Sequence, residues 1–198
     1  MTINEKKSEK FNGLAALIGH TPMLEISLLY KGEARIVYAK AEYYNYSGSI
    51  KDRVACHILR QAYETGAIAE GMPIAEATSG NTGIAFAAIG AYLGNPFTIF
   101  MPDWMSKERI NLIDDCDAIN MSRKLARVLG LGVGISSGAN NLGVLKAQDL
   151  LGNKDAVVAT VFADDNKKYL STDLMYEQTV SADHLACDVE LLGMRAIR

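Results

Sequence analysis

From residue 34 onward, short runs of β-branched residues alternate with stretches in which apolar residues recur every three or four positions. Gly, Pro, Ser or Asp residues bound these stretches. Such alternation is typical of βαβ units around a parallel sheet. The pattern therefore predicts an α/β protein, and a length of 198 residues fits one or two domains.

The same pattern places the individual elements. Strands are predicted over residues 35–40, 73–77, 97–101 and 156–162, the last of which is the most continuous apolar run. Helices are predicted over residues 50–65, 82–93 and 139–151, with two more beginning near Ser106 and Asp117 as capping residues. In the first helix, the apolar residues Ile50, Val54, Ile58 and Ala62 recur every four residues, and Gly66 marks its end.

Charge and hydropathy exclude two classes of partner. Lys and Arg number 20 against 23 Asp and Glu, for a net charge of −3, and the chain has no run of five basic residues. It therefore lacks the electrostatic signature of a nucleic-acid or anionic-membrane binder. The longest apolar stretch, residues 84–93, is interrupted by Gly90 and is shorter than the roughly 20 residues of a spanning helix. The polar N-terminal residues have no apolar signal core, and we expect a cytoplasmic protein.

The residues that most often bind metals are scattered. Three cysteines, at positions 56, 116 and 187, form no Cys-x-x-Cys pair, and three histidines, at positions 20, 57 and 184, have no second histidine or cysteine four residues away. The sequence therefore predicts neither a disulfide framework nor a metal site.

A first segment with candidate chemistry covers residues 47–53. Ser49 and Asp52 stand at the spacing of a capping box, which places Lys51 in the first turn of a helix. The positive end of the helix dipole disfavours protonation of an amine, so Lys51 is a candidate nucleophile able to form a Schiff base. A solvated lysine in an ordinary first turn fits the same spacing.

Two further segments are rich in glycine and hydroxyl residues. Residues 78–83 (Thr-Ser-Gly-Asn-Thr-Gly) lie between a predicted strand and a helix, where they form either an anion cradle or a plain capped turn. Residues 132–139 (Gly-Val-Gly-Ile-Ser-Ser-Gly-Ala) lead into another helix, but their glycine spacing matches neither a dinucleotide fingerprint nor a P-loop.

In this order, the three segments resemble the cysteine synthase family, which comprises O-acetylserine sulfhydrylases and cystathionine β-synthases with the tryptophan-synthase-β fold of pyridoxal-phosphate enzymes. Further matches are residues 18–23 (Ile-Gly-His-Thr-Pro-Met), 101–109 (Met-Pro-Asp-Trp-Met-Ser-Lys-Glu-Arg) and 168–173 (Lys-Tyr-Leu-Ser-Thr-Asp). The resemblance implies two abbreviated parallel-sheet lobes of that fold. Residues 42–113 would form the small lobe, which carries Lys51 and the Asn81 loop, and residues 1–41 with 114–198 would form the remnant of the large lobe.

The resemblance also implies roles for single residues. Lys51 matches the catalytic lysine that carries pyridoxal 5′-phosphate as a Schiff base and moves the substrate α-proton. Asn81 matches the asparagine that bonds the cofactor's 3-hydroxyl group, and Ser136 matches the serine that faces the pyridine nitrogen. The loop that holds the substrate carboxylate is matched by Thr78, Ser79, Asn81 and Thr82.

The implied reaction is β-replacement, in which O-acetylserine loses acetate and sulfide adds to give cysteine. The chain departs from the family by a gap, because members have roughly a hundred more residues between Ile113 and Asp114, although the remaining length still permits a folded domain. By resemblance, the gap includes the Gly-Thr-Gly-Gly-Thr loop that binds the cofactor phosphate. Its loss removes several charge-assisted hydrogen bonds of about 1.5–3 kcal/mol each, which is expected to weaken cofactor binding.

Two hypotheses follow. The first is a pyridoxal-phosphate enzyme of cysteine biosynthesis that is impaired by the internal deletion. The second is a non-catalytic homologue that binds a peptide through residues 78–82, as family members bind the C-terminal peptide of serine acetyltransferase. In both cases we expect a homodimer, since family members commonly dimerise and bared apolar surface favours association.

Overall fold

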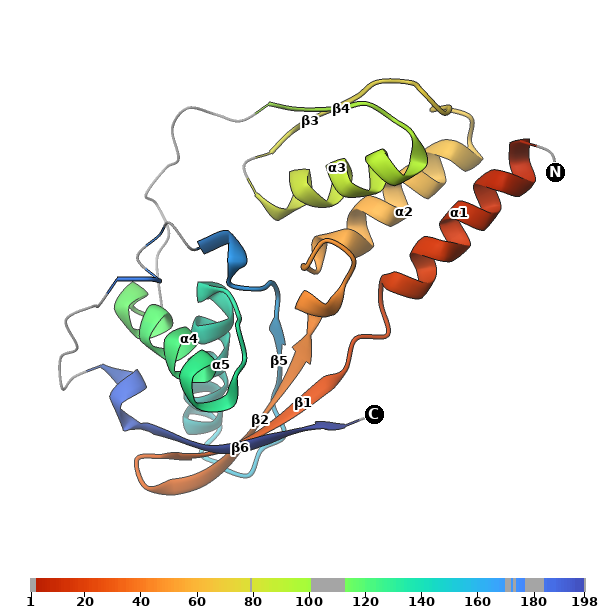
Figure 1. The fold of residues 1–198 in the computed structure, drawn as a ribbon. Coiled ribbons are helices and arrows are strands. Elements are labelled where there is room, and N and C mark those ends of the chain that lie inside the picture. Colours follow the sequence, from red (N-terminus) through yellow and green to blue (C-terminus); the bar gives the residue numbers. More distant parts are fainter. Residues whose placement is uncertain are drawn as a thin grey trace. The chain divides into compact units, whose positions relative to one another are not determined.

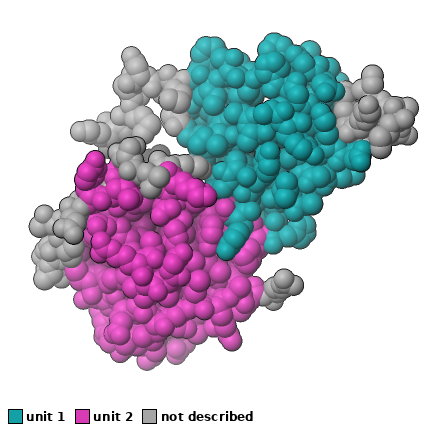
Figure 2. Space-filling model, in the orientation of Figure 1, with its two compact units in different colours: residues 1–20, 44–108 teal, residues 21–43, 109–198 magenta. Residues whose placement is uncertain are grey.

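A computed structural model describes residues 3–78, 80–100, 113–169, 172, 174–176 and 184–197, with backbone alone at 3–7 and 168. The chain forms two compact units, coloured separately in Figure 2. Unit 1 contains residues 1–20 and 44–108, and unit 2 contains residues 21–43 and 109–198. The N-terminal 20 residues thus group with the first unit, whereas the sequence analysis grouped them with the second, because their helix packs against the helices of unit 1.

Unit 1 is a short parallel βαβ unit with two additional helices (Figure 1). Its elements are α1 (Ile3–Leu17), α2 (Lys51–Glu64), β3 (Ile74–Ala77), α3 (Asn81–Leu93) and β4 (Phe97–Phe100). Strands β3 and β4 pair in parallel, and α3 connects them. The core forms where α1, α2 and α3 pack together, from Phe11, Leu14, Ala55, Cys56, Leu59, Ala85, Phe86, Ile89 and Leu93.

The buried face of α2 does not contain all of its regularly spaced apolar residues. Val54 and Ile58 are each 47% exposed. The helix instead buries Ala55 and Leu59, one position further along, against α1 and α3. The period identifies an apolar stripe on a helix, but it does not say which stripe a neighbouring element covers.

Unit 2 is built on a mixed four-stranded sheet in the order β5-β2-β1-β6. Its strands are β1 (Met23–Tyr30), β2 (Glu33–Ala41), β5 (Ala159–Phe162) and β6 (Val189–Ile197). Strand β1 pairs antiparallel with both β2 and β6, whereas β2 and β5 are parallel. Strands β1 and β2 form a tight hairpin, because Lys31 and Gly32 both adopt positive φ angles, of 52° and 78°, as a two-residue turn of this hand requires.

The helices of unit 2 are α4 (Asp115–Leu129) and α5 (Ile135–Leu150), and short 3-10 helices lie at η1 (Glu42–Tyr44), η2 (Lys167–Tyr169) and η3 (Leu185–Asp188). Helix η1 spans the boundary between the units. Alternate residues of β1 point inward to a core that α4 and α5 cover. A Cβ atom on Gly138 of α5 would lie 2.8 Å from the backbone nitrogen of Ser122, so these two helices approach very closely.

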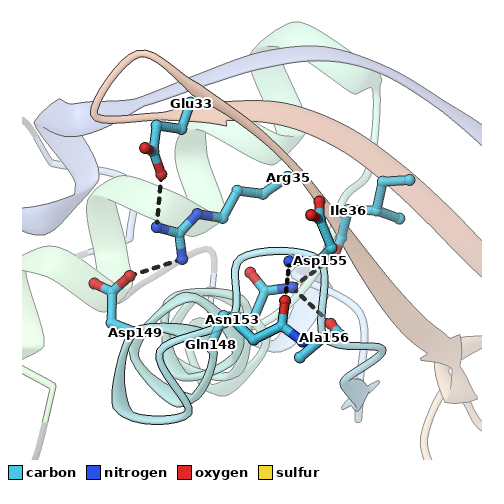
Figure 3. A network of polar contacts seen from close by, with 8 residues as sticks. All are labelled: Glu33, Arg35, Ile36, Gln148, Asp149, Asn153, Asp155 and Ala156. Carbon is cyan, nitrogen blue, oxygen red and sulfur yellow. Dashed lines mark hydrogen bonds and ion pairs between the residues drawn. The ribbon is translucent and has the colours of Figure 1, made fainter.

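A polar network lies beside the first half of β2, which does not pair with β5 (Figure 3). The buried Arg35 guanidinium lies 2.7 Å from Asp149 and 3.4 Å from Glu33. The side-chain amide of Gln148 donates to the carbonyl oxygens of Ile36, at 3.2 Å, and Ala156, at 3.0 Å. Gln148 thereby supplies a hydrogen bond that a longer β5 would otherwise provide.

Several predicted elements have different limits in the structure. Helix α4 is capped by Asp114, whose carboxylate accepts from the Cys116 backbone N–H at 2.9 Å, and not by Asp117. Helix α5 begins at Ile135, four residues before its predicted start. Strand β5 begins only at Ala159, and Val157 before it is 81% exposed.

Other elements were not anticipated or cannot be compared. The pattern did not identify α1, β1 or β6. The helix predicted to begin near Ser106 lies outside the described residues. None of the helices in the described part of the chain is long and apolar enough to cross a membrane.

Candidate cofactor and substrate site

The loop before Lys51 is held by hydrogen bonds within unit 1. The Asn45 side-chain oxygen accepts from the Gly19 backbone N–H at 2.8 Å. The Asn45 backbone carbonyl oxygen accepts from the Gly48 N–H at 2.9 Å. Gly48 has a φ of 85°, which a residue with a side chain rarely adopts, so glycine suits this turn. Residues 18–23 and 47–53, two of the matching segments, therefore contribute to one local structure at Gly19 and Gly48.

The predicted capping box is not formed. The N-cap of α2 is Ile50, whose side chain makes no capping hydrogen bond. The buried carboxylate of Asp52 reaches back to Ser47, accepting from its backbone N–H at 2.7 Å and from its hydroxyl group. The Ser49 hydroxyl accepts from the Lys51 backbone N–H at 3.3 Å. The capping-box spacing did not identify Ser47 as the partner of Asp52. The sequence signal for this pair is an Asp five residues after a Ser, with a Gly in the turn between them.

Lys51 is the first residue of α2, as the sequence predicts, and its side chain is exposed. Its two chain neighbours are hydrogen-bonded, because the Ile50 carbonyl oxygen accepts from the Arg53 backbone N–H at 3.2 Å and the Asp52 carboxylate accepts from Ser47. The amine thus extends from a fixed piece of backbone and is accessible to a small molecule. This placement is compatible with both interpretations of the sequence, a solvated lysine and an attachment point for an aldehyde.

The polar loop after β3 also lies where the sequence places it. The Thr78 backbone N–H donates to the Phe100 carbonyl oxygen at 2.9 Å, which continues the β3–β4 pairing by one residue. Helix α3 then begins at Asn81, and its N-cap, Gly80, provides no side-chain acceptor for the first backbone N–H groups. Such a helix N-terminus, at the carboxyl end of a parallel strand, favours an anionic group. Ser79 lies outside the described residues.

Gly83 shows why this loop needs small residues. A Cβ atom at position 83 would lie 2.7 Å from the Thr78 methyl carbon and 3.1 Å from the Ile99 side chain. Glycine therefore lets the first turn of α3 pack directly onto the ends of β3 and β4. Asn81 and Thr82, which precede it, are half-buried, and Asn81 has an interaction partner in the structure.

A surface hollow of unit 1, with a volume of about 330 Å³, is lined by one residue of segment 78–83 and by residues of α2 that follow segment 47–53. Thr82 of the loop and Val54 of α2 line it, and Val54 lies one turn after Lys51. The remaining lining is mostly apolar and is given by Ile58, Leu59, Ala62, Ile68, Ile74, Glu76 and Phe86. Lys51 and the Thr78–Thr82 loop are thus carried on adjoining elements of the same unit.

Ser136 belongs to unit 2, where it is exposed on the first turn of α5. The glycines around it have packing reasons of their own. A Cβ atom on Gly134 would lie 2.7 Å from the Tyr169 ring and closer still to the Asp164 carboxylate, and Gly138 approaches α4. Ser136 is therefore accessible, and its approach to the cofactor ring stays a prediction.

Tyr169, in the matching segment 168–173, has a structural role in unit 2. Its hydroxyl donates to the buried Asp164 carboxylate at 2.8 Å. Burial, with a further contribution from Asp164, raises the pKa of Tyr169, so this phenol stays protonated. Leu170, Ser171 and Asp173 of this segment, and the whole of 101–109, lie outside the described residues.

The residues of unit 1 fit the aldehyde and ring end of pyridoxal phosphate. An accessible primary amine at Lys51 supplies the nucleophile that such an aldehyde requires, and Asn81 at a helix N-terminus supplies an amide hydrogen-bonding group. The phosphate end of the cofactor has no corresponding Gly-Thr-Gly-Gly-Thr loop in the sequence.

The model of the family described as "Pyridoxal-phosphate dependent enzyme" matches residues 14–115. The chain belongs to this family. The matched range covers α2, α3 and both segments of unit 1 that carry the candidate site. The cofactor of the family is pyridoxal phosphate, and the predicted family relationship is confirmed.

Curated relatives of the chain include cysteine synthases. The chain is 46% identical over 99 residues to a probable cysteine synthase of Bacillus subtilis, an alignment covering 50% of this chain and 32% of that protein. It is 32% identical over 151 residues to a cysteine synthase of Dictyostelium discoideum, covering 76% and 38%. The aligned part of the chain therefore spans 32% and 38% of the length of these two curated relatives.

A solved structure resembles the chain over almost its whole length. A hydrogen sulfide-producing enzyme from Fusobacterium nucleatum is 32% identical and superposes with a TM-score of 0.85, covering 96% of this chain and 100% of that one. The predicted α/β class, with parallel pairing in both units and the tryptophan-synthase-β-like fold, is confirmed by this likeness and by the strand topology.

Proposed function

We propose that this chain catalyses a pyridoxal-phosphate-dependent β-replacement, forming cysteine from O-acetylserine and sulfide. The observation that carries this proposal is that Lys51, exposed at the start of α2 next to the Asp52–Ser47 hydrogen bonds, lies within the residues that match the pyridoxal-phosphate family. An attachment lysine has to be accessible to the cofactor and held in place by its neighbours. The cysteine synthases among the relatives support the choice of reaction.

Each site residue has a defined task in this reaction. The Lys51 amine would hold the cofactor, and its Nζ atom would take the proton from the substrate α-carbon. The backbone N–H groups at the start of α3, with the hydroxyl groups of Thr78 and Thr82, bind the substrate carboxylate. Asn81 orients the cofactor ring, and Ser136 offers a neutral hydroxyl group to the ring nitrogen. When bound, pyridoxal phosphate supplies the electron sink for loss of the acetate leaving group.

A pair of lysine variants tests this proposal. The protein is incubated with pyridoxal phosphate, reduced with borohydride and digested, and the labelled peptide is identified by mass spectrometry. We expect the label on Lys51 and sulfide-dependent cysteine formation from O-acetylserine. Lys51→Ala should lower turnover at least about 100-fold, because one residue acts as both nucleophile and base. Lys154→Ala, a change at an exposed lysine of unit 2, is the matched control.

A different labelling pattern would contradict the assignment. Label spread over many lysines, or cofactor-dependent turnover that Lys51→Ala retains, would show that Lys51 is not the attachment residue. Ser136→Ala tests the second unit, since it should alter the absorption spectrum of the lysine-bound cofactor while leaving the labelled residue unchanged.

The missing phosphate loop favours a second candidate function, a non-catalytic peptide-binding protein. In this case the α3 N-terminus and Thr82 would bind the terminal carboxylate of a peptide such as the serine acetyltransferase tail. Calorimetry with that peptide, and with the same peptide amidated at its C-terminus, separates the two functions. A protein that binds the free-acid peptide but not the amidated one, and that takes up no pyridoxal phosphate, would favour the peptide-binding function over the enzyme.

We also propose that the chain forms a homodimer. Unit 1 exposes apolar side chains at Val54, Ile58, Ile99 and Phe100, which association would cover. Sedimentation equilibrium of the full chain measures this directly, and a mass near 21.5 kDa at all concentrations would contradict it.

A further inference from the structure

Three side chains with metal-ligand chemistry meet in unit 2, although the sequence scatters them. They are Asp114 and Cys116 at the start of α4 and His184, which directly precedes η3. One ligand atom from each lies within 4.8 Å of the other two, and the His184 Nε2 to Asp114 Oδ1 distance is 4.0 Å. Since His184 stands 68 residues after Cys116, no local motif could reveal this group. The sequence predicts no metal site, and only the fold brings these three side chains together.

Buried hydrogen bonds hold the two segments together. The Asp117 carboxylate accepts from the backbone N–H of Ala186 at 2.8 Å, in the interior. The Lys124 ammonium donates to the carbonyl oxygens of Ala186 and Val189, each at 2.6 Å. These contacts anchor η3 and the start of β6 on α4. His184 therefore reaches the N-terminus of α4 because its backbone is anchored two residues further on.

The ligand side of the cluster is also partly organised. Asp114 is the N-cap of α4, and its Oδ1 atom accepts from the Cys116 backbone N–H at 2.9 Å. The Asp114 side chain is exposed, whereas Cys116 and His184 are half-buried. Two ligands thus have restricted surroundings, and the third can rotate toward an ion from the solvent side.

We propose that Asp114, Cys116 and His184 bind one Zn²⁺ ion, with a water molecule in the fourth position. In a tetrahedral zinc site, bond lengths of about 2.0–2.3 Å place ligand atoms roughly 3.3–3.8 Å apart. The observed spacing of up to 4.8 Å needs a contraction of roughly 1 Å, which side-chain rotation provides. A thiolate, an imidazole and one carboxylate select zinc over Mg²⁺ or Ca²⁺, which prefer oxygen ligands only.

The charge around the cluster suits a divalent cation. A Cys116 thiolate and the Asp114 carboxylate together neutralise the two charges of Zn²⁺. The helix N-terminus adds a partial positive charge, but Asp115 and Asp117 in the same turn offset it. Bound zinc would connect α4 directly to the segment before η3 within unit 2 and would keep one coordination position open to water. The site is independent of the cofactor chemistry proposed for Lys51.

Metal titration of the full chain tests this site without any enzyme assay. The protein is stripped with a chelator, kept reduced with a phosphine, and titrated with CoCl₂ and then with ZnCl₂. We expect one equivalent of Co²⁺ to produce an intense near-ultraviolet band from thiolate coordination, which Zn²⁺ then removes. Zinc should also raise the melting temperature, because it binds only the folded arrangement.

Variants identify the ligands. Cys116→Ser and His184→Ala should each weaken zinc binding at least about 100-fold, since even outer-shell changes cost 10–100-fold. Asp114→Asn retains a capping side chain and should weaken binding with the helix intact. Cys187→Ser is the matched control, because this exposed thiol lies in η3 but outside the cluster, and its binding should match the parent protein.

Several results would overturn the proposal. The first is a Co²⁺ complex of the parent protein that has no thiolate band. The second is zinc binding that is equally strong in Cys116→Ser and the parent protein. The third is a loss of zinc affinity in Cys187→Ser as large as that in Cys116→Ser. If Cys116→Ser does not fold, the Co²⁺ spectrum of Cys187→Ser decides the question. A retained thiolate band supports Cys116 as the ligand, and loss of the band would show that Cys187 coordinates instead.

Discussion

Replacing Gly138 by alanine should destabilise unit 2 strongly. A Cβ atom at this position would lie 2.8 Å from the Ser122 backbone nitrogen, even nearer to its hydroxyl oxygen, and nearest to the Ala118 carbonyl oxygen. Two of these three atoms are backbone atoms of α4, so no side-chain rotation can relieve the overlap. The helices α4 and α5 would have to separate over the core that they cover.

The size of the effect follows from two opposing contributions. Overpacking a well-packed interior costs about 1–3 kcal/mol and occasionally more, and contact with backbone atoms places Gly138→Ala at the upper end. Alanine in place of glycine within a helix returns about 1 kcal/mol. The net loss in the free energy of unfolding should therefore be about 2 kcal/mol or more, which lowers the melting temperature by roughly 4–8 °C.

Gly143→Ala provides the matched control on the same helix. A Cβ atom there meets nothing within 4 Å, so the propensity gain alone should remain and stabilise α5 by up to about 1 kcal/mol. Urea unfolding followed by circular dichroism gives both values, and hydrogen exchange of α4 and α5 amides reports unit 2 by itself. Equal stability of the two variants would refute the close approach of α4 and α5 at Gly138.

Three other changes have defined outcomes. Asn95→Ala should cost roughly 3 kcal/mol in urea unfolding, because this buried amide donates to two backbone carbonyls of unit 1 at 2.8 and 2.9 Å. Tyr169→Phe should cost about 1–3 kcal/mol in the same assay by removing the hydroxyl donor of buried Asp164. Hydrogen bonding from Arg195 lowers the pKa of Glu25 below its ordinary 4.5, so this link between β1 and β6 is present at neutral pH and is lost as the pH falls through the lowered pKa. Glu25→Gln should remove that acid-induced loosening of β6, as measured by NMR of β6 amides.

Much of the chain's organisation could be predicted from local patterns. The strand at residues 35–40, the helices beginning at Lys51 and near Asn81, and the strand at residues 97–101 appear close to their predicted limits. Each combines a clear hydrophobic period with a glycine or proline at a boundary, and both signals act over a few residues. Lys51 at a helix start and Thr78–Thr82 at a strand–helix turn follow from these limits.

The predictions that failed depended on distant parts of the chain. Spacing alone could not show that α2 buries Leu59 and leaves Val54 exposed, since α1 and α3 decide which stripe is covered. Asp52 bonds to Ser47 and does not form the predicted reciprocal cap with Ser49, because the turn at Gly48 brings Ser47 close to it.

By itself, the sequence determined the α/β class, most elements after residue 34, the family and the position of the candidate lysine, because short-range periodicity and contiguous motifs carry that information. Only the tertiary structure decided that β1 and β6 complete the second sheet and that His184 meets Asp114 and Cys116. It also decided that Gly138 is required by a neighbouring helix. These features arise when segments far apart in the chain bury shared apolar surface, and no local pattern records which segments will meet.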